Sequence, residues 1–471
     1  MAFIGHLLGE QLDFPGEEFQ RLSPVDGSSL RPWTEVAPGV LDPLIATLKT
    51  LNLSAEADLK ARSAALLQLA SDLERDAASL ARLITMETGC PVAQSEVLQV
   101  QSAVALIRSL VEQASEFAFT EERVGARGGK VRIDRLPIGI ALGIVPCNVP
   151  IFLACLKLAT ALLAGCPVVL KPSPENVDSM ALFSRYLARM DLPTGAVNLV
   201  LGGRVLGDQL VRNDVFRKVS FTGSSASGLA VAKLCAQRFA RVTLELGGKS
   251  SAILLDDVDF TAVKDQLWLA MLQNNGQVCG AQSRVLIPKS RAPELRSALT
   301  KMFEDTVVGD PRSPETGIGP VVTAEAANRI RNTCNEATSQ GALLLSGTRE
   351  EPQESATVPP RLYEVKDSVA EIWNEELFGP VACLRVYDTV EEAAGWANES
   401  RYGLSGSVWS GDANRALGIA QRLKTGSVAV NSKKILDFVA PFGGWGQSGI
   451  GRELGEDGFR SYLETRTILL P

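Results

Sequence analysis

Residues 140–170 read IALGIVPCNVPIFLACLKLATALLAGCPVVL. Ile140–Val145 is a short apolar run that fits a buried strand, and Val168–Leu170 predicts another. Residues 151–163 between them are long enough for a helix, which Gly165 ends. A strand, a helix and a strand within about 30 residues predict a βαβ unit, and such units build a parallel sheet.

The same stretch imitates a membrane span, because Lys157 is its only charge between Ile138 and Leu170. A transmembrane helix needs about 20 uninterrupted apolar residues. Four helix-breaking residues divide this stretch into shorter pieces: Pro146, Pro150, Gly165 and Pro167. We therefore expect a protein core here and no membrane partner.

Alternating strand and helix patterns continue downstream of this unit. Residues 181–189 and 205–212 have helical spacing, and strand patterns follow at 197–201, 219–221, 242–246 and 252–255. This alternation predicts an open, doubly wound α/β domain, with a second α/β region from near Leu246 to about Val430. Upstream, apolar residues three and four apart predict a helix over 55–88, with Gly89 as its stop.

Two further segments predict β-structure outside these layers. Residues 124–136 (VGARGGKVRIDRL) mix glycine with alternating charged and apolar residues, as an exposed hairpin does. From Asp457 the chain alternates again, through FRSYLETRTILL. We expect this last segment to form a strand that pairs with the hairpin.

The composition excludes several classes of function. The 471 residues include 47 Lys+Arg and 54 Asp+Glu, a formal net charge of −7, so we expect neither a nucleic-acid nor an anionic-membrane partner. The single histidine, His6, argues against Ser-His-Asp and Cys-His catalysis and against a histidine-rich metal site. Eight cysteines without a CxxC pair fit the reduced thiols of a cytoplasmic protein.

Two glycine-rich segments are similar to phosphate-binding loops. Gly247–Ser250 ends like a P-loop, but Thr243 stands where that motif needs a glycine, which favours a tight turn between strands. Gly223–Gly228 follows a predicted strand and opens a helix, so its backbone amides are suited to face a phosphate. Turns of this composition also occur without any nucleotide, so this signal is weak by itself.

Cys279 lies in NNGQVCG (274–280), where glycines leave room for a ligand and the thiolate is a good nucleophile. Without an available histidine, a carboxylate must take the thiol proton, and Glu245 is the candidate. Glu245 ends a predicted strand against Gly247-Gly248, an apolar setting that raises a carboxyl pKa. The residues alone leave open a buried, unreactive Cys279 and a solvated charge at Glu245.

A series of motifs, in order along nearly the whole chain, resembles the aldehyde dehydrogenase superfamily. The motifs are PCNVP (146–150), KPS (171–173), FTGS (221–224), ELGGK (245–249), GQVC (276–279), EELFGP (375–380), PFGG (441–444) and SGIGRE (448–453). The resemblance implies an α/β fold with a doubly wound, Rossmann-like dinucleotide-binding domain over 1–122 and 139–246. It further implies an α/β catalytic domain over 247–430, a loop closing the substrate tunnel over 431–454, and a small β-arm for oligomerisation over 123–138 and 455–471.

The resemblance also assigns the chemistry, which is oxidation of an aldehyde to a carboxylic acid with NAD(P)+. Cys279 is expected to attack the aldehyde carbon, and the oxyanion is expected to lie against the Asn148 amide and the Cys279 N–H. After hydride transfer to the nicotinamide, Glu245 is expected to activate the water that hydrolyses the thioester. No metal is implied.

The dinucleotide-binding residues follow from the same motifs. Lys171 is expected at the adenosine ribose, Gly223 and Ser224 at the pyrophosphate, and Glu376 and Phe378 at the nicotinamide end. The full expected set is Val145, Pro146, Lys171, Ser173, Glu175, Gly223, Ser224, Leu246, Glu376 and Phe378. Glu175 favours NAD, because a carboxylate repels a 2′-phosphate. It stands one position later than the family's usual glutamate, which leaves NADP open.

The substrate tunnel has an expected lining of moderate-sized apolar residues, which favours an apolar or aromatic aldehyde. That lining comprises Val149, Leu153, Leu156, Gln273, Val278, Leu436, Phe438 and Phe442. Lys157 is expected to face the tunnel, and Lys433 and Lys434 to lie near its mouth. Cys147 stands where the family usually has a tryptophan, and Glu453 is a candidate for a proton path or an ion pair.

Two other functions remain open on this resemblance. The first is an acylating enzyme that passes the thioester to coenzyme A, although such members generally lack the glutamate found here as Glu245. The second is a catalytically silent protein that kept the fold and the nucleotide site. Self-association to a dimer or tetramer is expected in each case.

Overall fold

The computed structural model describes residues 4–7, 10–13, 16–36, 39, 41–51, 53–348, 355–366 and 371–471, and the side chain of His6 lies outside this described part. A parallel sheet forms its first layer, in the order β2-β1-β9-β8-β7-β10-β11-β21. The central strands β9 to β11 pair in parallel, whereas β1, β2 and β21 pair antiparallel at the two ends. Their bounds are β1 Ile4–Leu7, β2 Glu10–Asp13, β7 Ile140–Ile144, β8 Val168–Lys171, β9 Val197–Leu199, β10 Phe216–Thr222, β11 Arg241–Glu245 and β21 Gly449–Ile450.

The expected βαβ unit is confirmed as β7, α6 (Pro150–Leu163) and β8. Pro150 suits the start of α6, because the first turn of a helix needs no N–H from it. Every residue of α6 except Leu153 is buried, which explains why the sequence is apolar enough to imitate a membrane span. Among the described residues, no helix combines the length and apolarity needed to cross a bilayer.

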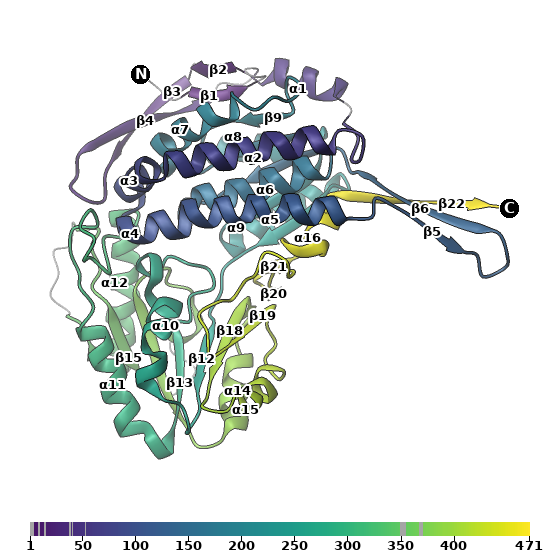
Figure 1. Ribbon diagram of the computed structural model, residues 1–471. Coiled ribbons are helices and arrows are strands. Elements are labelled where there is room, and N and C mark those ends of the chain that lie inside the picture. The colour runs from purple at the N-terminus through teal and green to yellow at the C-terminus, as the bar shows by residue number, and fades with distance from the viewer. Residues whose placement is uncertain are drawn as a thin grey trace.

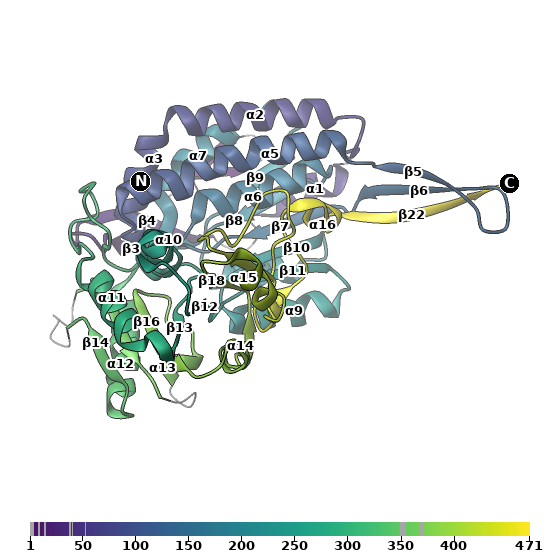
Figure 2. The same cartoon turned by 60° about the horizontal axis from the view of Figure 1, so that its bottom comes forward.

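Helices cover both faces of this sheet: α2 and α5 lie in front of it in Figure 1, and Figure 2 shows α9 on the opposite side. A buried cluster joins α2, α5 and α6 through Leu69, Leu110 and Leu158, among others. The helices of this layer are α1 Asp42–Thr50, α2 Leu59–Arg75, α3 Ala77–Thr88, α4 Val92–Ser95, α5 Ser102–Glu116, α7 Val177–Leu187, α8 Arg204–Arg212 and α9 Ser225–Gln237, with a π-helix η1 at Glu96–Gln101 and a short 3-10 turn η2 at Pro174–Asn176.

The prediction of one helix over 55–88 is wrong, because α2 ends at Arg75 and α3 begins at Ala77. Asp76 between them leaves helical geometry, with φ −102° and ψ 17°. Its carboxylate accepts hydrogen bonds from Arg75 and from the Tyr186 hydroxyl, the latter at 2.8 Å. A contact with α7, distant in sequence, therefore accompanies the break.

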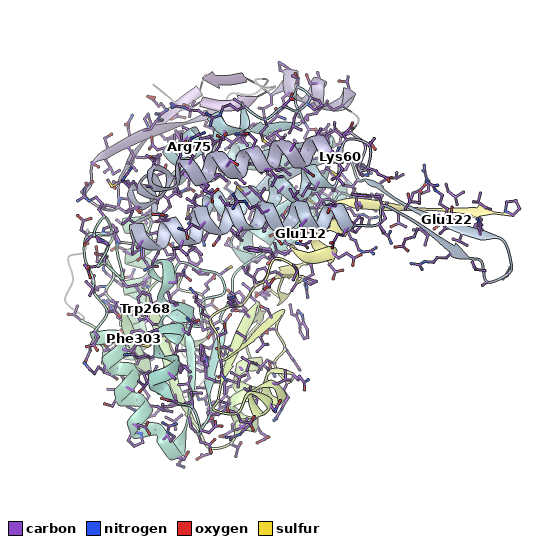
Figure 3. The ribbon with its side chains drawn as sticks, viewed as in Figure 1. Lys60, Arg75, Glu112, Glu122, Trp268 and Phe303 are labelled. Carbon is purple, nitrogen blue, oxygen red and sulfur yellow. The ribbon has the colours of Figure 1, made fainter. Side chains whose placement is uncertain are left out.

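A second parallel sheet lies below the first in Figure 1, in the order β14-β15-β16-β13-β12-β18-β19. Its strands are β12 Ser251–Leu254, β13 Arg284–Pro288, β14 Leu343–Ser346, β15 Arg361–Glu364, β16 Val381–Tyr387, β18 Ser405–Trp409 and β19 Ser427–Val430. Only β14 pairs antiparallel among these described strands. The helices around it are α10 Phe260–Leu272, α11 Ala292–Glu304, α12 Ala324–Ser339, α13 Glu371–Asn374, α14 Val390–Asn398 and α15 Ala413–Ala420, with 3-10 turns η3 Gln273–Gly276 and η4 Lys289–Arg291. Figure 3 shows Trp268 of α10 and Phe303 of α11 in this layer.

A three-stranded arm projects from the body, as Figures 1 and 2 both show. It consists of β5 (Thr120–Val124), β6 (Lys130–Pro137) and β22 (Leu463–Leu470), and β22 pairs along the whole length of β6. The expected pairing of the last segment with the hairpin is therefore confirmed. Figure 3 places Glu122 of β5 on this arm.

The expected strand begins too early, because Gly455–Arg460 form the helix α16 and the strand starts at Leu463. Phe459 of α16 is buried and its ring lies edge-on to Phe117, with ring centroids 4.8 Å apart. This aromatic packing places Phe459 in the core beside α5, and the chain becomes extended only beyond it. Two further strand pairs complete the description: β3 Gly16–Leu22 with β4 Ser29–Val36, and β17 Tyr402–Gly403 with β20 Trp445–Gly446.

Candidate active site

Cys279 follows a left-handed turn at the end of α10. Asn274, Asn275 and Gly276 have φ values of 56°, 58° and 71°, a conformation that asparagine and glycine tolerate best. The Asn275 side-chain amide donates to the carbonyls of Gly89 and Pro320, at 2.9 and 2.8 Å, and its oxygen accepts from the Gly319 N–H. The turn that presents Cys279 is thus fastened to two distant segments.

The sequence predicts that the glycines around Cys279 leave room for a ligand. This explanation is wrong, because protein atoms occupy the space beside both glycines. A Cβ on Gly276 would lie 2.2 Å from the Gly379 carbonyl oxygen, and one on Gly280 would lie 2.0 Å from Cδ1 of Ile435. Both glycines therefore admit neighbouring protein atoms. The space next to Cys279 comes instead from a cavity bounded by several elements.

This cavity has a volume of about 620 Å³, a size typical of small-molecule sites. Cys279, Asn148 and Glu245 all line it, although they come from three different parts of the chain. The cavity also brings together most of the other expected site residues: Pro146, Val149, Leu153, Leu156, Gly223, Ser224, Leu246, Val278, Glu376, Phe378, Leu436 and Phe442.

Six of the expected dinucleotide-binding and tunnel-lining residues do not line this cavity: Val145, Lys171, Ser173, Glu175, Gln273 and Phe438. Val145 precedes the lining residue Pro146, Lys171 is the last residue of β8, and Ser173 and Glu175 follow that strand. Gln273 lies between α10 and the left-handed turn, which separates it from Val278 and Cys279. Its expected place in the substrate lining is therefore not supported.

Glu245, the last residue of β11, is buried, with 3% of its surface exposed. Neither carboxylate oxygen has a hydrogen-bond partner among the described residues. Burial raises the pKa of this carboxyl well above its usual value, and the nearby Glu453 charge adds to the effect, against Lys157 and Arg452. The apolar setting expected for Glu245 is confirmed, and the solvated-charge alternative is wrong.

The Cys279 thiol is protonated at neutral pH in this environment. Burial, with the charges of Glu376 and Glu245, raises its pKa to about 12. Backbone N–H groups of Gly280 and Cys279 hydrogen-bond the sulfur and act in the opposite direction. A base must therefore accept the proton as the sulfur reacts.

Asn148 lies between β7 and α6, and its side-chain amide donates to the carbonyl of Gln277 at 2.8 Å. An amide nitrogen carries two N–H groups, so this bond uses one and leaves the other for the cavity. The segment that leads to Cys279 thus fixes the orientation of the Asn148 amide.

The Gly247-Gly248 turn accommodates a carboxylate and a neighbouring backbone. A Cβ on Gly247 would lie 2.3 Å from Glu376 Oε2, and one on Gly248 would lie 2.4 Å from the Cys279 carbonyl oxygen. The Gly248 N–H donates to Glu376 Oε1 at 3.1 Å, and burial raises the pKa of Glu376 to about 7. Gly247–Ser250 form an irregular connection from β11 to β12 of the second sheet, and a strand follows them where a P-loop has a helix.

Lys157 does not face the cavity, contrary to expectation. Its ammonium is fully buried and donates to Glu453 Oε1 at 2.7 Å and to Ser220 Oγ at 2.8 Å. Ser220 Oγ also donates to Glu453 Oε1, at 2.7 Å. Glu453 itself lines the cavity, so the lysine lies behind this carboxylate as its ion-pair partner.

The N-terminus of α9 supplies polar groups to the cavity. Ser224 caps this helix by accepting a hydrogen bond from the Ser227 N–H at 3.3 Å. Ser224, Ser225 and Ala226 line the cavity, and a helix N-terminus favours an anionic group. Within the described part of the chain, no His, Cys, Asp and Glu side chains cluster as a metal site does.

Sequence reasoning missed several lining residues. Phe152 had a signal, because helical spacing places Val149, Phe152 and Leu156 on one face of α6. Phe438 does not line the cavity but packs against Phe152, with ring centroids 6.2 Å apart. Thr222, Leu377 and Glu453 stand inside the motifs FTGS, EELFGP and SGIGRE, which could have indicated them as lining residues. The other missed residues had no local signal: Leu98, Arg329, Arg401, Tyr402, Ile435 and Leu454.

Comparisons with known proteins agree over nearly the whole chain. Residues 17–468 match the model of the aldehyde dehydrogenase family. Geranial dehydrogenase of Castellaniella defragrans is 36% identical over 88% of this chain and 86% of its own length. A 3-succinoylsemialdehyde-pyridine dehydrogenase of a Pseudomonas species is 37% identical over 83% of this chain and 82% of its own length.

Solved structures give the same picture. An aldehyde dehydrogenase of Mycobacterium tuberculosis complexed with NAD+ is 32% identical, with a TM-score of 0.95 over 100% of this chain and 99% of that one. A mutant of aldehyde dehydrogenase C of Pseudomonas syringae, complexed with NAD+ and octanal, is 30% identical, with a TM-score of 0.93 over 99% and 96% of the two chains.

Proposed function

The chain belongs to the aldehyde dehydrogenase family, and we propose that it oxidises an apolar aldehyde to the carboxylic acid with NAD(P)+ through a thioester on Cys279. One observation carries the proposal. Cys279, the Asn148 amide and a buried Glu245 without hydrogen-bond partners among the described residues line a single cavity. These are the nucleophile, oxyanion donor and base that the reaction requires.

The first step forms a bond between Cys279 Sγ and the aldehyde carbon, while the thiol proton passes to a base. The carbonyl oxygen becomes an oxyanion, which the free N–H of Asn148 and the backbone N–H of Cys279 stabilise. One such donor is worth about 3–4 kcal/mol of the barrier. Bound NAD(P)+ supplies the hydride acceptor, so that collapse of the adduct leaves a thioester on Cys279.

The second step is hydrolysis of that thioester. Glu245 removes a proton from water, and the oxygen adds to the thioester carbon. Expulsion of the Cys279 sulfur then gives the acid. A carboxyl pKa raised well above its usual value makes Glu245 a stronger base than an ordinary surface glutamate. Glu453, in the same cavity and paired with Lys157 and Ser220, provides an exit for the proton.

The dinucleotide is assigned to the ends of the parallel strands, where ligands bind in doubly wound folds. The N-terminus of α9 with Ser224 suits the pyrophosphate, and Glu376 and Phe378 suit the nicotinamide end. The Val145 N–H donates to the Lys171 carbonyl at 3.0 Å, so Lys171 lies beside the segment that enters the cavity. Lys171, Ser173 and Glu175 are assigned to the adenosine ribose, and Glu175 favours NAD over NADP.

The substrate is assigned to the apolar side of the cavity. Lys433 and Lys434, which the sequence predicts near the mouth, do not line it. The names of a relative and a bound ligand support an apolar aldehyde, since one relative is a geranial dehydrogenase and one structure holds octanal. The lining on this side is Leu98, Val149, Phe152, Leu153, Leu156, Val278, Ile435, Leu436 and Phe442.

The proposal includes a dinucleotide-binding domain (1–122 and 139–246), a catalytic domain (247–430), a tunnel-closing loop (431–454) and an oligomerisation arm (123–138 and 455–471). The arm of β5, β6 and β22 projects from the body and exposes Val124, Leu469 and Leu470, which suits pairing with another copy in a dimer or tetramer. Glu245 argues against the acylating alternative. Turnover with water as the only acyl acceptor, without coenzyme A, separates the two.

The test is an absorbance assay for reduced nicotinamide. The purified protein is mixed with NAD or NADP and a panel of aliphatic, aromatic and acidic aldehydes, with Cys279→Ala as control. We expect turnover that depends on Cys279 and favours apolar aldehydes. Dinucleotide binding without turnover on any aldehyde would favour the silent alternative.

A further inference from the structure

The π-helix η1 brings two consecutive residues toward the site, one into the cavity and one behind it. Turns of this kind are rare inside helices and occur frequently at functional sites. Leu98 of η1 lines the cavity, and its neighbour Gln99 is completely buried. The wider turn of η1, between α4 and α5, therefore has two inward-facing side chains in sequence.

Gln99 is hydrogen-bonded to the residue assigned to the oxyanion. Its Nε2 donates to the backbone carbonyl of Asn148 at 3.0 Å. The side-chain amide of Asn274, from the left-handed turn, donates to the same carbonyl, also at 3.0 Å. Two buried amides from separate elements thus hold one carbonyl oxygen.

This carbonyl belongs to a segment without regular structure. Asn148 follows β7 and precedes α6, and no helix or strand includes it. Its side chain is fixed at the other end by the bond from Nδ2 to the Gln277 carbonyl. The two contacts to the carbonyl fix the position of the Asn148 backbone. The contact with Gln277 fixes the direction of its side-chain amide.

We propose that Gln99 is a positioning residue that holds the Asn148 amide at the distance and angle required for the oxyanion. The inference rests on the proposed function, in which Asn148 stabilises the oxyanion. Both covalent steps pass through an oxyanion on the same carbon, so the effect of Gln99 extends to both. Catalytic groups misplaced by about 1 Å can lose a hundredfold in rate, and loss of one of two anchors should displace Asn148 by less.

The test variant is Gln99→Met, which keeps the length of the side chain and removes its N–H donors. The matched control is Gln101→Met in the same π-helix, where the side chain is exposed and its amide donates to Glu96. Each substitution is made in the wild-type chain and together with Asn148→Ala. The measurements are the burst rate of reduced nicotinamide, the steady-state rate, NAD affinity and the thermal midpoint.

We expect Gln99→Met to lower the burst rate and the steady-state rate by roughly tenfold each, with NAD affinity within about twofold of wild type. In the Asn148→Ala background, Gln99→Met should change neither rate, because the amide that Gln99 positions is absent. Gln101→Met should match wild type. An unchanged burst rate in Gln99→Met, or an equal tenfold loss with and without Asn148→Ala, would overturn the assignment.

The same set separates this inference from the proposed function. If Asn148→Ala itself leaves the burst rate unchanged, the oxyanion role fails and the inference fails with it. If Asn148→Ala slows the burst and Gln99→Met does not, only the role of Gln99 fails. Gln99→Leu, which also lacks a donor, replaces the methionine variant if that protein does not fold.

Discussion

Glu245 and Glu453 line the same cavity, yet Glu453 accepts hydrogen bonds from Lys157 and Ser220 while Glu245 accepts none from the described residues. Two neighbouring carboxylates in different settings titrate differently. Glu453 lies against the Lys157 ammonium and the Ser220 hydroxyl, so its negative charge has a partner inside the protein. The unpaired Glu245, with burial and the Glu453 charge raising its pKa, is the one suited to take up a proton.

This pair predicts opposite shifts in the pH dependence of thioester hydrolysis. Glu245 is active when ionised, so the rate falls as pH falls through its pKa. Lys157→Met removes a charge that lowers this pKa, so the acidic limb should move to higher pH. Glu453→Gln removes a charge that raises it, so the limb should move to lower pH. Steady-state rates from pH 5 to 9 measure both, and shifts in the same direction would contradict the assignment.

Replacement of the nucleophile should separate chemistry from binding. Cys279→Ala removes the sulfur that forms the covalent bond from the protein to the substrate, so oxidation should fall to background. The dinucleotide is assigned to other groups, and its affinity should stay within about twofold of wild type. Absorbance of reduced nicotinamide and equilibrium binding test the two parts, and surviving turnover would disprove the role of Cys279.

Replacement of the base should separate the two covalent steps. Glu245→Gln keeps the shape of the side chain but cannot accept a proton, so hydrolysis should slow by about a hundredfold or more. Stopped-flow absorbance should then show one burst of reduced nicotinamide per site, followed by slow turnover. A missing burst would mean that Glu245 is also required to remove the Cys279 proton, whose pKa of about 12 leaves little thiolate at rest.

The left-handed turn before Cys279 should tolerate no side chain at Gly276. Alanine there combines a positive φ of 71° with a Cβ 2.2 Å from the Gly379 carbonyl oxygen. We expect Gly276→Ala to lower the free energy of unfolding by about 2–5 kcal/mol. Gly341→Ala, at φ 93° with open space around it, isolates the backbone term and should cost about 1–2 kcal/mol. Chemical denaturation compares them, and equal losses would exclude a steric contribution.

The apolar lining predicts how activity depends on substrate length. Each methylene transferred from water into the cavity is worth about 0.8 kcal/mol, so kcat/KM should rise about fourfold per carbon among short linear aldehydes. Leu153→Ser, on the cavity face of α6, should flatten this dependence. A series from propanal to octanal measures the slope, and a flat series in the wild-type chain would count against an apolar substrate.

The parts of the fold that the sequence predicts are those determined by local patterns. The unit β7-α6-β8 follows from apolar runs and breakers within about 30 residues. The break at Asp76 has no such local pattern, and the Tyr186 hydroxyl that donates to its carboxylate lies 110 residues away.

The candidate site also has residues that local motifs predict and contacts that they do not predict. Cys279, Glu245 and Asn148 stand in recognisable motifs, and the structure places them around one cavity. The Lys157–Glu453 pair joins residues 296 positions apart, and the atoms that fill the space beside Gly280 belong to Ile435. Such contacts depend on how the two sheets and the segments after β19 meet, which no short-range pattern encodes.

The pairing of β11 with β21 also has a consequence for synthesis of the protein. Leu244 and Glu245 find their partners at Ile450 and Gly449, roughly 200 residues later in the chain. A ribosome adds about 5–20 residues per second, so some 10–40 seconds separate the two strands. Through that interval Glu245 has neither the strand beside it nor Glu453 in its cavity. A chain that ends before Gly449 lacks β21 and Glu453, so we expect it to lack a complete site.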